Sequence, residues 1–444
     1  MKKRILLAIS LLLSFQIFAQ KEQLLSGPML GYNTMKEVSI WCQTIAPAEC
    51  QIIYWPVNDW QLMRSTKIIE TTRENAHTCE FILDYLEPGT SYQYALLING
   101  QNVVDKSKSS TFRTQAQWKW RSDPEEFSFL TGSCTYINEA AYDRPGTPYG
   151  TAIKILDQMS NDSARFMLWL GDNMYMRESD WESRSGVLRR YTHTRQTKEM
   201  QPLLSKMHHY AIWDDHDFGS NDANGSYVNK SYTREAFDLF WANPRNANEY
   251  NEDGIYTKFT WQDCEFFLLD GRYNKRRFGK EGGELLGEKQ LNWLLESLVK
   301  SEATFKFIAV GSQFLNDATN KECFYVEGNH ERQTIIDFIE KYKIKGVVFI
   351  TGDRHFTEFA SYKNKDKIGF YEITSSPITS TVATGKYTTE PNSFLEPGSR
   401  VLENVYTKIS VSGPQKNRML KLEVININGD IKWKKTLSQI DFEP

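Results

Sequence analysis

Four short polar clusters, each placed directly after an apolar run, contain the side chains best suited to chemistry in this 444-residue chain. They are residues 132–134 (Gly-Ser-Cys), 171–175 (Gly-Asp-Asn-Met-Tyr), 214–217 (Asp-Asp-His-Asp) and 352–355 (Gly-Asp-Arg-His). Their thiol, phenol, carboxylate and imidazole groups are the common ligands of metal ions in proteins. A carboxylate at a strand end often bridges two ions about 3.5–4 Å apart, and Asp172 is the candidate for that bridge. The clusters therefore predict a metal site, and we expect it to hold two ions.

The elements that must position these clusters are buried strands. The apolar runs before them, residues 127–130, 166–170, 210–213 and 347–350, have the length and composition of strands in an α/β sheet. Ligands in such sheets gather at the carboxyl ends of the strands, so the clusters are expected to converge in one crevice. Two further apolar runs, 266–269 and 305–310, also read as buried strands. Helical periodicity is found over residues 149–159, 187–207, 232–241, 287–299 and 330–342.

The pattern before this α/β region differs from it. Residues 24–115 contain short β-rich runs bounded by turn residues, with Asn99-Gly100 as a hairpin turn, and predict an all-β domain. The stretch 86–92 is similar to the tyrosine corner of immunoglobulin-like and fibronectin type III sandwiches. A polar, Trp-containing segment at 115–124 predicts a linker, and residues 125–440 predict the α/β domain.

The first residues are expected to be a targeting segment. Residues 1–4 are basic, 5–15 are apolar and Ala19 is small, so residues 1–19 are typical of a Sec-type signal peptide. We therefore expect export to the periplasm or the medium, with no transmembrane anchor. The net charge of −3 gives no electrostatic reason to expect a nucleic-acid partner. Of the six cysteines, Cys42, Cys50 and Cys79 allow one disulfide in the N-terminal region, whose connectivity the sequence leaves open.

The order of the clusters, Gly-Ser-Cys, Gly-Asp-x-x-Tyr, Trp-Asp-Asp-His-Asp and Gly-Asp-Arg-His, resembles that of the alkaline phosphatase D (PhoD-like) metallophosphatases. These are relatives of the purple acid phosphatases within the calcineurin-like superfamily. The resemblance covers residues 125–380, and the preceding β-domain is similar to the N-terminal domain of the family. It implies an α/β fold, a four-layer α/β/β/α sandwich preceded by a small immunoglobulin- or fibronectin III-like β-sandwich. It also implies an Fe³⁺–Ca²⁺ centre, with other divalent ions left open.

Carried over residue by residue, the resemblance implies a ligand set. Iron would be held by Cys134, Asp172, Tyr175 and His355. Asp172 would bridge to calcium, with Asp215 and Asp353 as further oxygen ligands. This division is chemically sensible, because a phenolate favours a trivalent iron and carboxylate oxygens suit Ca²⁺.

The resemblance also implies an activity, the hydrolysis of small-molecule or polymeric phosphate mono- or diesters. A metal-bound hydroxide would attack phosphorus, and His216 would assist departure of the alcohol. Asp217 would orient His216 through its other ring nitrogen. Arg272 follows the strand 266–269 and is expected at the same rim, where its guanidinium would bind a phosphate oxygen pair.

Three places depart from the family pattern or imitate another one. The N-terminus has Lys2, Lys3 and Arg4 in place of a twin-arginine pair, which favours Sec export. Gln313 follows the strand 305–310, where the wider superfamily has a histidine, and its carbonyl oxygen is a candidate calcium ligand. Residues 328–331 spell Gly-Asn-His-Glu, a metallophosphatase motif, but they open an amphipathic helix and are expected to be a helix start.

Two alternatives stay open at this point. One is a phosphodiesterase acting on phospholipid head groups, in the manner of a phospholipase D, or on teichoic-acid-like polymers. It would keep the same metal ligands and differ in the surrounding loops. The other is a non-enzymatic, secreted calcium-binding adhesion module, which would need neither Cys134 nor Tyr175.

Overall fold

The structure is a computed structural model that describes residues 23–103, 110–245, 253–277, 283–318, 323–365 and 369–442. The chain divides into two compact units, residues 1–115 and 116–444. The predicted signal peptide, residues 1–19, lies outside the described residues. Among the residues that the structure does describe, none belongs to a helix long and apolar enough to cross a membrane.

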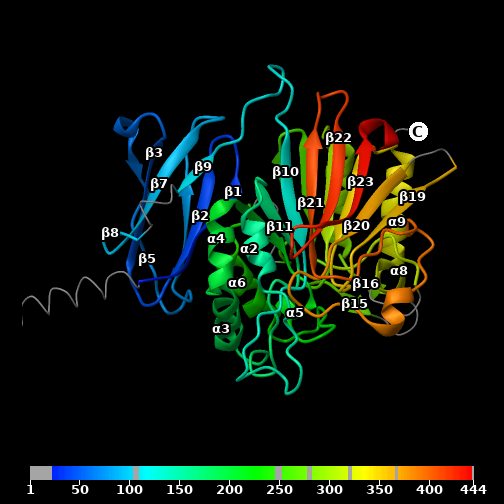
Figure 1. Cartoon of the computed structure of the whole chain (residues 1–444), viewed down its shortest axis with the longest axis horizontal. Coiled ribbons are helices and arrows are strands. Elements are labelled where there is room, and N and C mark those ends of the chain that lie inside the picture. Colours follow the sequence, from blue (N-terminus) through cyan, green and yellow to red (C-terminus); the bar gives the residue numbers. More distant parts are fainter. Residues whose placement is uncertain are drawn as a thin grey trace, which may run out of the picture. The chain divides into compact units, whose positions relative to one another are not determined.

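The N-terminal unit consists of short strands that enclose one apolar core (blue in Figure 1). One group has the order β1 (Leu24–Asn33), β2 (Val38–Thr44), β6 (Thr78–Leu83). The second has the order β4 (Arg64–Ser65), β3 (Glu49–Pro56), β7 (Ser91–Ile98), β8 (Gln101–Asn102), with β5 (Ile69–Glu70) on β3 and β9 (Thr111–Arg113) on β7. Ile40 and Phe81 from the first group meet Ile52 and Leu96 from the second in the core. This is the predicted β-sandwich.

Two local devices predicted from the sequence are present in this unit. The hydroxyl of Tyr92 accepts a hydrogen bond from the amide of Glu87 at 2.9 Å, which is the contact that defines a tyrosine corner. Asn99 and Gly100 have φ values of 48° and 76° and join β7 to β8. Positive φ at both central residues is typical of the type I′ hairpin turn.

The C-terminal unit contains two sheets. The first has the order β23 (Ile431–Ser438), β22 (Met419–Asn426), β21 (Val405–Ser412), β10 (Phe127–Gly132), β11 (Phe166–Leu170), β12 (His208–Ile212). The second has the order β13 (Thr257–Trp261), β14 (Cys264–Leu268), β17 (Phe305–Val310), β18 (Val347–Thr351), β20 (Gly369–Thr374), β19 (Glu358–Lys363). In each sheet the central strands are parallel, and antiparallel strands extend the edges.

Aromatic side chains pack the two sheets face to face. The ring of Phe129 in β10 lies edge-on to Phe266 in β14 and Phe307 in β17, with centroids 5.2 and 5.3 Å apart. The next residue along each of those strands, Phe267 and Ile308, points to the opposite face and joins a separate apolar cluster with the helices. This alternation is what a strand covered on both faces requires.

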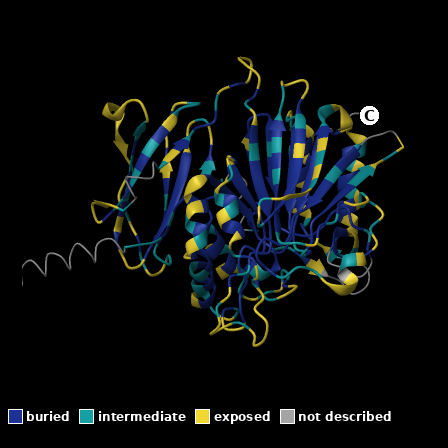
Figure 2. Ribbon diagram, viewed as in Figure 1, coloured by how far each residue is buried: buried dark blue, intermediate teal, exposed yellow. Residues whose placement is uncertain are grey.

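Helices cover the outer faces of the sheets, as the predicted four-layer α/β/β/α sandwich requires. Figure 1 shows α2 (Ile155–Ser160) and α4 (Gln201–Lys206) on one side of the strands and α8 (Phe324–Glu327) and α9 (Asn329–Lys341) on the other. Leu294 and Leu298 of α7 (Glu288–Lys300) and Ile335 of α9 pack on the second sheet. Figure 2 shows that buried residues are concentrated in the strands.

The remaining elements lie in the loops that follow the strands. They are α3 (Arg184–Arg195), α5 (Asp215–Phe218), α6 (Lys230–Phe240), the strand pair β15 (Arg276–Arg277) and β16 (Gly283–Glu284), and short 3-10 turns. The helix predicted over 187–207 is broken after α3, and the helix predicted from 149 begins only at Ile155. Pro202 lies in the first turn of α4, where a proline is readily accommodated, whereas it is not in a helix interior.

Candidate metal centre

Three overlapping groups of metal-ligating side chains lie where β10, β11, β12 and β18 end. Within each group the donor atoms lie within 4.8 Å of one another. The groups are Cys134, Asp172 and His355; Asp172, Asp215 and His216; and Asp214, Asp215 and Asp353. Asp172 and Asp215 each belong to two groups, so the donors form one continuous set. The set contains five of the six residues to which the resemblance assigns a metal: Cys134, Asp172, Asp215, Asp353 and His355. The sixth, Tyr175, lies against His355.

The backbone at this centre is held in an unusual conformation. Cys134, Asp172, Asp353 and His355 have φ values of 60°, 49°, 67° and 57°. Residues other than glycine rarely adopt this left-handed region, and such strain persists only where the surrounding structure imposes it. Each of these residues follows a parallel strand that leaves the sheet abruptly. The turns therefore aim the side chains into the space between the strand ends.

The thiol of Cys134 is completely buried beside two acidic residues. Its Sγ lies 3.6 Å from Oδ2 of Asp172 and 3.4 Å from the main-chain oxygen of Asp353, and it accepts a hydrogen bond from Ser376 Oγ at 3.2 Å. Burial and the charge of Asp172 raise the pKa of this thiol well above its usual value. A thiolate at this position therefore needs a cation beside it.

His355 and Tyr175 face each other next to this thiol. Nδ1 of His355 donates a hydrogen bond to the main-chain oxygen of Thr381 at 2.5 Å, which leaves the Nε2 lone pair available to a metal. The Tyr175 hydroxyl lies 3.5 Å from that Nε2 and 3.3 Å from the hydroxyl of Ser380. Burial and the charge of Asp172 raise the pKa of Tyr175 well above its usual value.

A compact group of carboxylates occupies the other side of the centre. Burial and the charges of Asp214 and Asp215 raise the pKa of Asp353 to about 7. Burial also opposes ionisation of Asp215, but the positive charges of His216 and Arg272 hold its pKa below the usual value. Oδ2 of Asp214 and Oδ1 of Asp215 are buried and accept no hydrogen bond from the described residues. Buried carboxylate oxygens without a donor are suited to a cation.

Arg272 is placed differently from the expectation. Its side chain is 0% exposed, so it does not lie on an open rim, and its Nε donates to Oδ1 of Asp214 at 2.5 Å. Its Nη2 lies 3.7 Å from Oδ1 of Asp215. The guanidinium is therefore a counter-ion to the two carboxylates. A strand end also provides buried positions, and an adjacent pair of aspartates attracts a cation there.

Asp217 and Gln313 also have partners other than those expected. The two carboxylate oxygens of Asp217 accept hydrogen bonds from the amides of Asn173 and Asp214, at 2.9 and 3.0 Å, so the carboxylate ties two loops together. The side-chain oxygen of Gln313 accepts from Asn316 and Arg354, at 2.7 and 2.9 Å. Since these donors occupy it, this oxygen is not a calcium ligand in the described arrangement.

His216 lies at the boundary between the centre and a cavity. Its amide donates to Oδ1 of Asp172 at 3.3 Å, and its half-buried ring lies 4.2 Å from that of Tyr175. The cavity has a volume of about 330 Å³, and His216, Tyr175 and Tyr149 contribute to its wall. A side chain in this position is able to reach both a group at the centre and a group in the cavity.

Sequence reasoning missed two contributors to the centre. Asp214 belongs to the carboxylate group, and its adjacency to Asp215 in the predicted cluster was a signal that could have identified it. Ser376 contacts Cys134 and follows β20, whose carboxyl end lies beside that of β18. The Gly-Asn-His-Glu stretch behaves as predicted: Asn329 begins α9, His330 is exposed, and Glu331 accepts hydrogen bonds from the amides of residues 285–287.

Comparison with protein families gives two matches on this chain. A family model described as PhoD-like phosphatase matches residues 129–408, which is more than half of the chain. A second, described as a domain of unknown function (DUF7800), matches residues 21–116. Alkaline phosphatase D of Bacillus subtilis (strain 168) is 24% identical over 357 residues, which cover 68% of this chain and 56% of that protein. The chain thus matches little more than half the length of that relative.

Two solved structures share the fold. The structure of PhoD superimposes with a TM-score of 0.73 and 15% identity, covering 92% of this chain and 87% of that one. The purple acid phosphatase PPD1 from yellow lupin (Lupinus luteus) seeds superimposes with a TM-score of 0.69 and 13% identity, covering 93% of this chain and 74% of that one. These likenesses confirm the predicted fold class.

Proposed function

The chain belongs to the PhoD-like phosphatase family, and we propose that it hydrolyses phosphate mono- or diesters at a centre of two metal ions. The observation that carries the proposal is the continuous set of donors in which Asp172 and Asp215 each belong to two groups. Family membership and the shared fold support a phosphoric ester hydrolase of the metallophosphoesterase class. They also favour the enzyme over the adhesion module.

The donors fit two different ions. Cys134, Tyr175 and His355 offer a thiolate, a phenolate and an imidazole nitrogen, a set that suits Fe³⁺, and Asp172 completes it. Asp214, Asp215 and Asp353 offer only carboxylate oxygens, which suit Ca²⁺. When bound, two such ions activate water and stabilise negative charge on the phosphoryl group. Asp214 is added here to the ligands predicted from the sequence.

The side chains around the donors have separate tasks in this proposal. A ring nitrogen of His216 holds the proton that the departing alcohol receives, since His216 borders both the centre and the cavity. Arg272 offsets the charge of Asp214 and Asp215. Asp217 acts as a positioning residue that keeps the loops after β11 and β12 together.

The proposal extends to the whole chain. The two compact units and the family matches at 21–116 and 129–408 support the predicted division into domains 24–115 and 125–440. The basic and apolar pattern of residues 1–19 supports export through a Sec-type signal peptide to the periplasm or the medium.

The test combines turnover with metal analysis of the same sample. We expect the purified protein to contain iron and calcium and to hydrolyse 4-nitrophenyl phosphate or its bis-ester. Asp172→Asn should lower kcat more than about a hundredfold, because even the loss of a group outside the ligand shell costs 10–100-fold. Asp337→Asn, an exposed carboxylate of α9, is the matched control and should change kcat little. Full activity and metal content in Asp172→Asn would refute the proposed centre.

A further inference from the structure

The cavity beside the candidate metal centre has an aromatic wall. Its volume is about 330 Å³, and its lining includes Tyr136, Tyr149, Tyr175, Trp181, Met176 and His216. Resting on the proposed function, we propose that this cavity binds the leaving group of the substrate, and that this group is uncharged and aromatic.

The aromatic rings form a continuous series from the metal donors into the cavity. The ring of His216 lies 4.2 Å from that of Tyr175, Tyr175 lies 5.0 Å from Tyr136, and Tyr136 lies 4.9 Å from Tyr149. Tyr149 in turn lies 5.8 Å from the ring of His355. A phosphoryl group held at the centre is therefore adjacent to the cavity. The oxygen atom of the leaving group would then face the aromatic surfaces of the cavity. Flat rings in edge-on and tilted arrangements pack well against another aromatic group.

The charged groups of the wall are already paired. Arg177 is buried and binds Asp143, with Nη2 2.6 Å from Oδ1, and its guanidinium lies 4.0 Å above the Tyr136 ring. At the mouth, Arg144 lies 2.8 Å from Oε1 of Glu178. Both arginines of the lining thus have a carboxylate partner, and His216 lies beside the carboxylates of Asp172 and Asp215, so the wall gives a second anionic group no unmatched positive charge. A leaving group with its own phosphate or carboxylate would lose hydration there without compensation.

The experiment compares two esters whose leaving alcohols are similarly basic, benzyl phosphate and ethyl phosphate. Burial of a phenyl ring in the cavity should make kcat/KM for benzyl phosphate at least about tenfold higher. Trp181→Ala should reduce this preference severalfold. Tyr142→Ala is the matched control, because this tyrosine of the same loop region packs on Arg189 and is not among the residues that line the cavity.

A second measurement separates this inference from the proposed function. Calorimetric binding of benzylphosphonate and ethylphosphonate to the metal-loaded protein tests the cavity without turnover. Benzylphosphonate should bind at least about tenfold more tightly, and Trp181→Ala should narrow the difference. If the protein hydrolyses neither ester but keeps this binding preference, the proposed function fails and the cavity assignment stands. Equal affinities, or a preference that Trp181→Ala leaves intact, would overturn the assignment.

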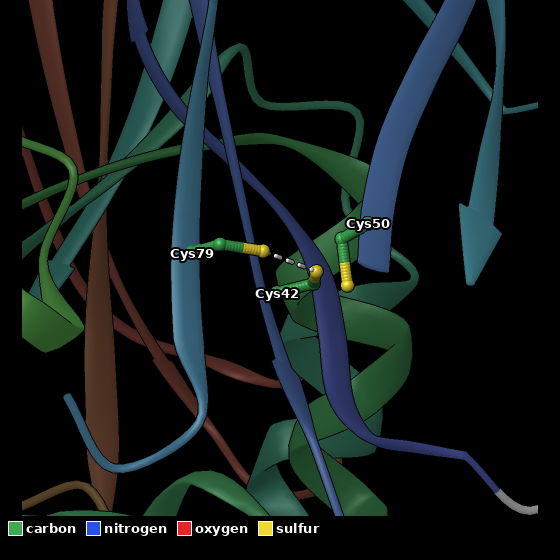
Figure 3. Close-up of side chains that lie close together, drawn as sticks. All are labelled: Cys42, Cys50 and Cys79. Carbon is green, nitrogen blue, oxygen red and sulfur yellow. Dashed lines mark hydrogen bonds between the residues drawn. The ribbon is translucent and has the colours of Figure 1, made fainter. Parts of the chain in front are cut away.

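A separate inference concerns three cysteines in the core of the N-terminal unit. Cys42 lies in β2, Cys79 in β6 and Cys50 in β3, and Figure 3 shows Cys42 between the other two. Their exposed fractions are 0%, 6% and 0%. The sulfur atoms of Cys42 and Cys79 are 3.3 Å apart, and all three lie within 4.8 Å of one another. We infer that Cys42 and Cys79 form a disulfide when a disulfide oxidant is present, and that Cys50 keeps its thiol.

Geometry selects this pair. Cys42 and Cys79 are direct partners on neighbouring antiparallel strands, where Cα atoms are about 4.5–5.5 Å apart, within the range of disulfides. A soft metal ion held by three thiolates is the rival assignment. With a monovalent or divalent ion it would carry a net charge of about −2 or −1. The apolar residues that pack around the cysteines provide no cation to offset that charge, whereas a disulfide is neutral.

The oxidation balances with a disulfide such as oxidised glutathione. The thiols of Cys42 and Cys79 lose two electrons and two protons, one sulfur–sulfur bond forms between them, and the oxidant is reduced to two thiols. Because the sulfur atoms are buried, the reaction requires transient opening of the sandwich and is expected to be slow. The bridge would link two residues that are 37 positions apart in the chain and stabilise the folded unit.

The full chain is incubated in oxidised glutathione and digested, and its disulfide-linked peptides are identified by mass spectrometry. We expect a Cys42–Cys79 link in the natural sequence and in Cys50→Ser, with a higher urea midpoint after oxidation. Cys79→Ser should lose that shift, and Cys264→Ser, a buried cysteine of the other unit, should keep it. A Cys42–Cys50 link in place of the expected one, unlinked thiols after prolonged oxidation, or stoichiometric binding of a soft metal by these cysteines would overturn the inference.

Discussion

Asp214 and Asp215 place two carboxylates next to each other in a buried site, and Arg272 is the cation that lies against both. Breaking a buried ion pair by removing one partner costs about 3–5 kcal/mol, because the remaining charge is left without compensation. We therefore expect Arg272→Gln to lower the free energy of unfolding of the metal-free protein by about that amount, and bound metal cations to recover part of the loss by offsetting the two carboxylates. Urea denaturation of the metal-free and metal-loaded protein measures both effects.

The control for this substitution is an ion pair at the surface. Lys119 lies 2.8 Å from Glu302, with side-chain exposures of 48% and 81%. Exposed pairs contribute about 0–1 kcal/mol, so Lys119→Gln should leave the unfolding midpoint nearly unchanged. Similar effects of the two substitutions would contradict the role assigned to Arg272.

Lys306 provides a pH-dependent contribution to stability. It lies in β17, is 5% exposed and donates to the main-chain oxygens of Ala303 and Lys345. Burial lowers its pKa to about 8, from about 10.4 in an unfolded chain. Between these values the unfolded chain binds the proton and the folded chain does not, so stability rises as the pH rises through this window. Below pH 8 both states are protonated, and Lys306 contributes no slope.

The measurement compares the natural sequence with Lys306→Met by urea denaturation between pH 7 and pH 10. The difference in free energy of unfolding should change by on the order of 2–3 kcal/mol across that range, in favour of the natural sequence at high pH. Other groups that titrate at alkaline pH cancel in the difference. A difference that stays constant with pH would show that Lys306 keeps an ordinary pKa.

At the residue scale, the sequence predicted which side chains gather at the centre better than it predicted which residues each of them contacts. Cys134, Asp172 and His355 gather as expected, because their positions at strand ends follow from the alternation of apolar runs and polar clusters. Arg272 and Asp217 lie in the same region. The sequence could not show that Arg272 is a buried counter-ion or that the Asp217 carboxylate holds two loops together by hydrogen bonds. Such roles depend on the side chains contributed by other loops.

At the scale of elements, the strands were predicted closely and the turns were not. The apolar runs 166–170 and 305–310 coincide with β11 and β17, because a strand buried on both faces reads as a continuous apolar segment. The left-handed conformations of Cys134, Asp172 and Asp353 leave no such signal, since none of these residues is a glycine, the residue type that marks a left-handed position in a sequence. They result from the requirement that several loops share one small volume.

Gly171 is a position where the crowding of these loops is pronounced, because the loop that contains Asp214 passes directly against it. Its φ is +92°, and a Cβ there would lie 2.6 Å from Cβ of Asp214. We expect Gly171→Ala to push the loops after β11 and β12 apart, with loss of bound metal and a lower melting temperature. Gly100→Ala is the matched control, since its φ is +76° but nothing lies within 4 Å of the added Cβ. It should cost only about 1 kcal/mol of backbone strain.

Metal analysis by mass spectrometry and thermal melting of both variants distinguish the effect of a steric clash from that of backbone strain alone. Strain without a clash should leave the metal content of Gly100→Ala unchanged. Retention of full metal content in Gly171→Ala would mean that the two loops tolerate displacement, contrary to the close approach described here.

At the scale of the whole molecule, the two-unit organisation and the α/β/β/α layers could be predicted, whereas the strand order could not. β21, β22 and β23 extend the sheet that contains β10, although about 270 residues separate β10 from β21. Pairings of this kind are specified by which apolar faces complement each other after the chain has folded. The local alternation of residues predicts that such strands exist but not which strand they join.

The candidate centre draws its donors from both sheets of the C-terminal unit, since Cys134, Asp172 and Asp215 follow strands of the first and Asp353 and His355 follow β18 of the second. Ions bound there would tie the two sheets together and stabilise only the folded state. At metal concentrations about 100 times the dissociation constant the gain is about 2.7 kcal/mol for each ion, and the two ions together correspond to roughly 8 °C in Tm for a unit of this size. We expect a chelator to lower Tm by that amount, re-addition of iron and calcium to restore it, and Asp172→Asn to abolish the response. A chelator-induced shift that persists in Asp172→Asn would place the stabilising ions elsewhere in the molecule.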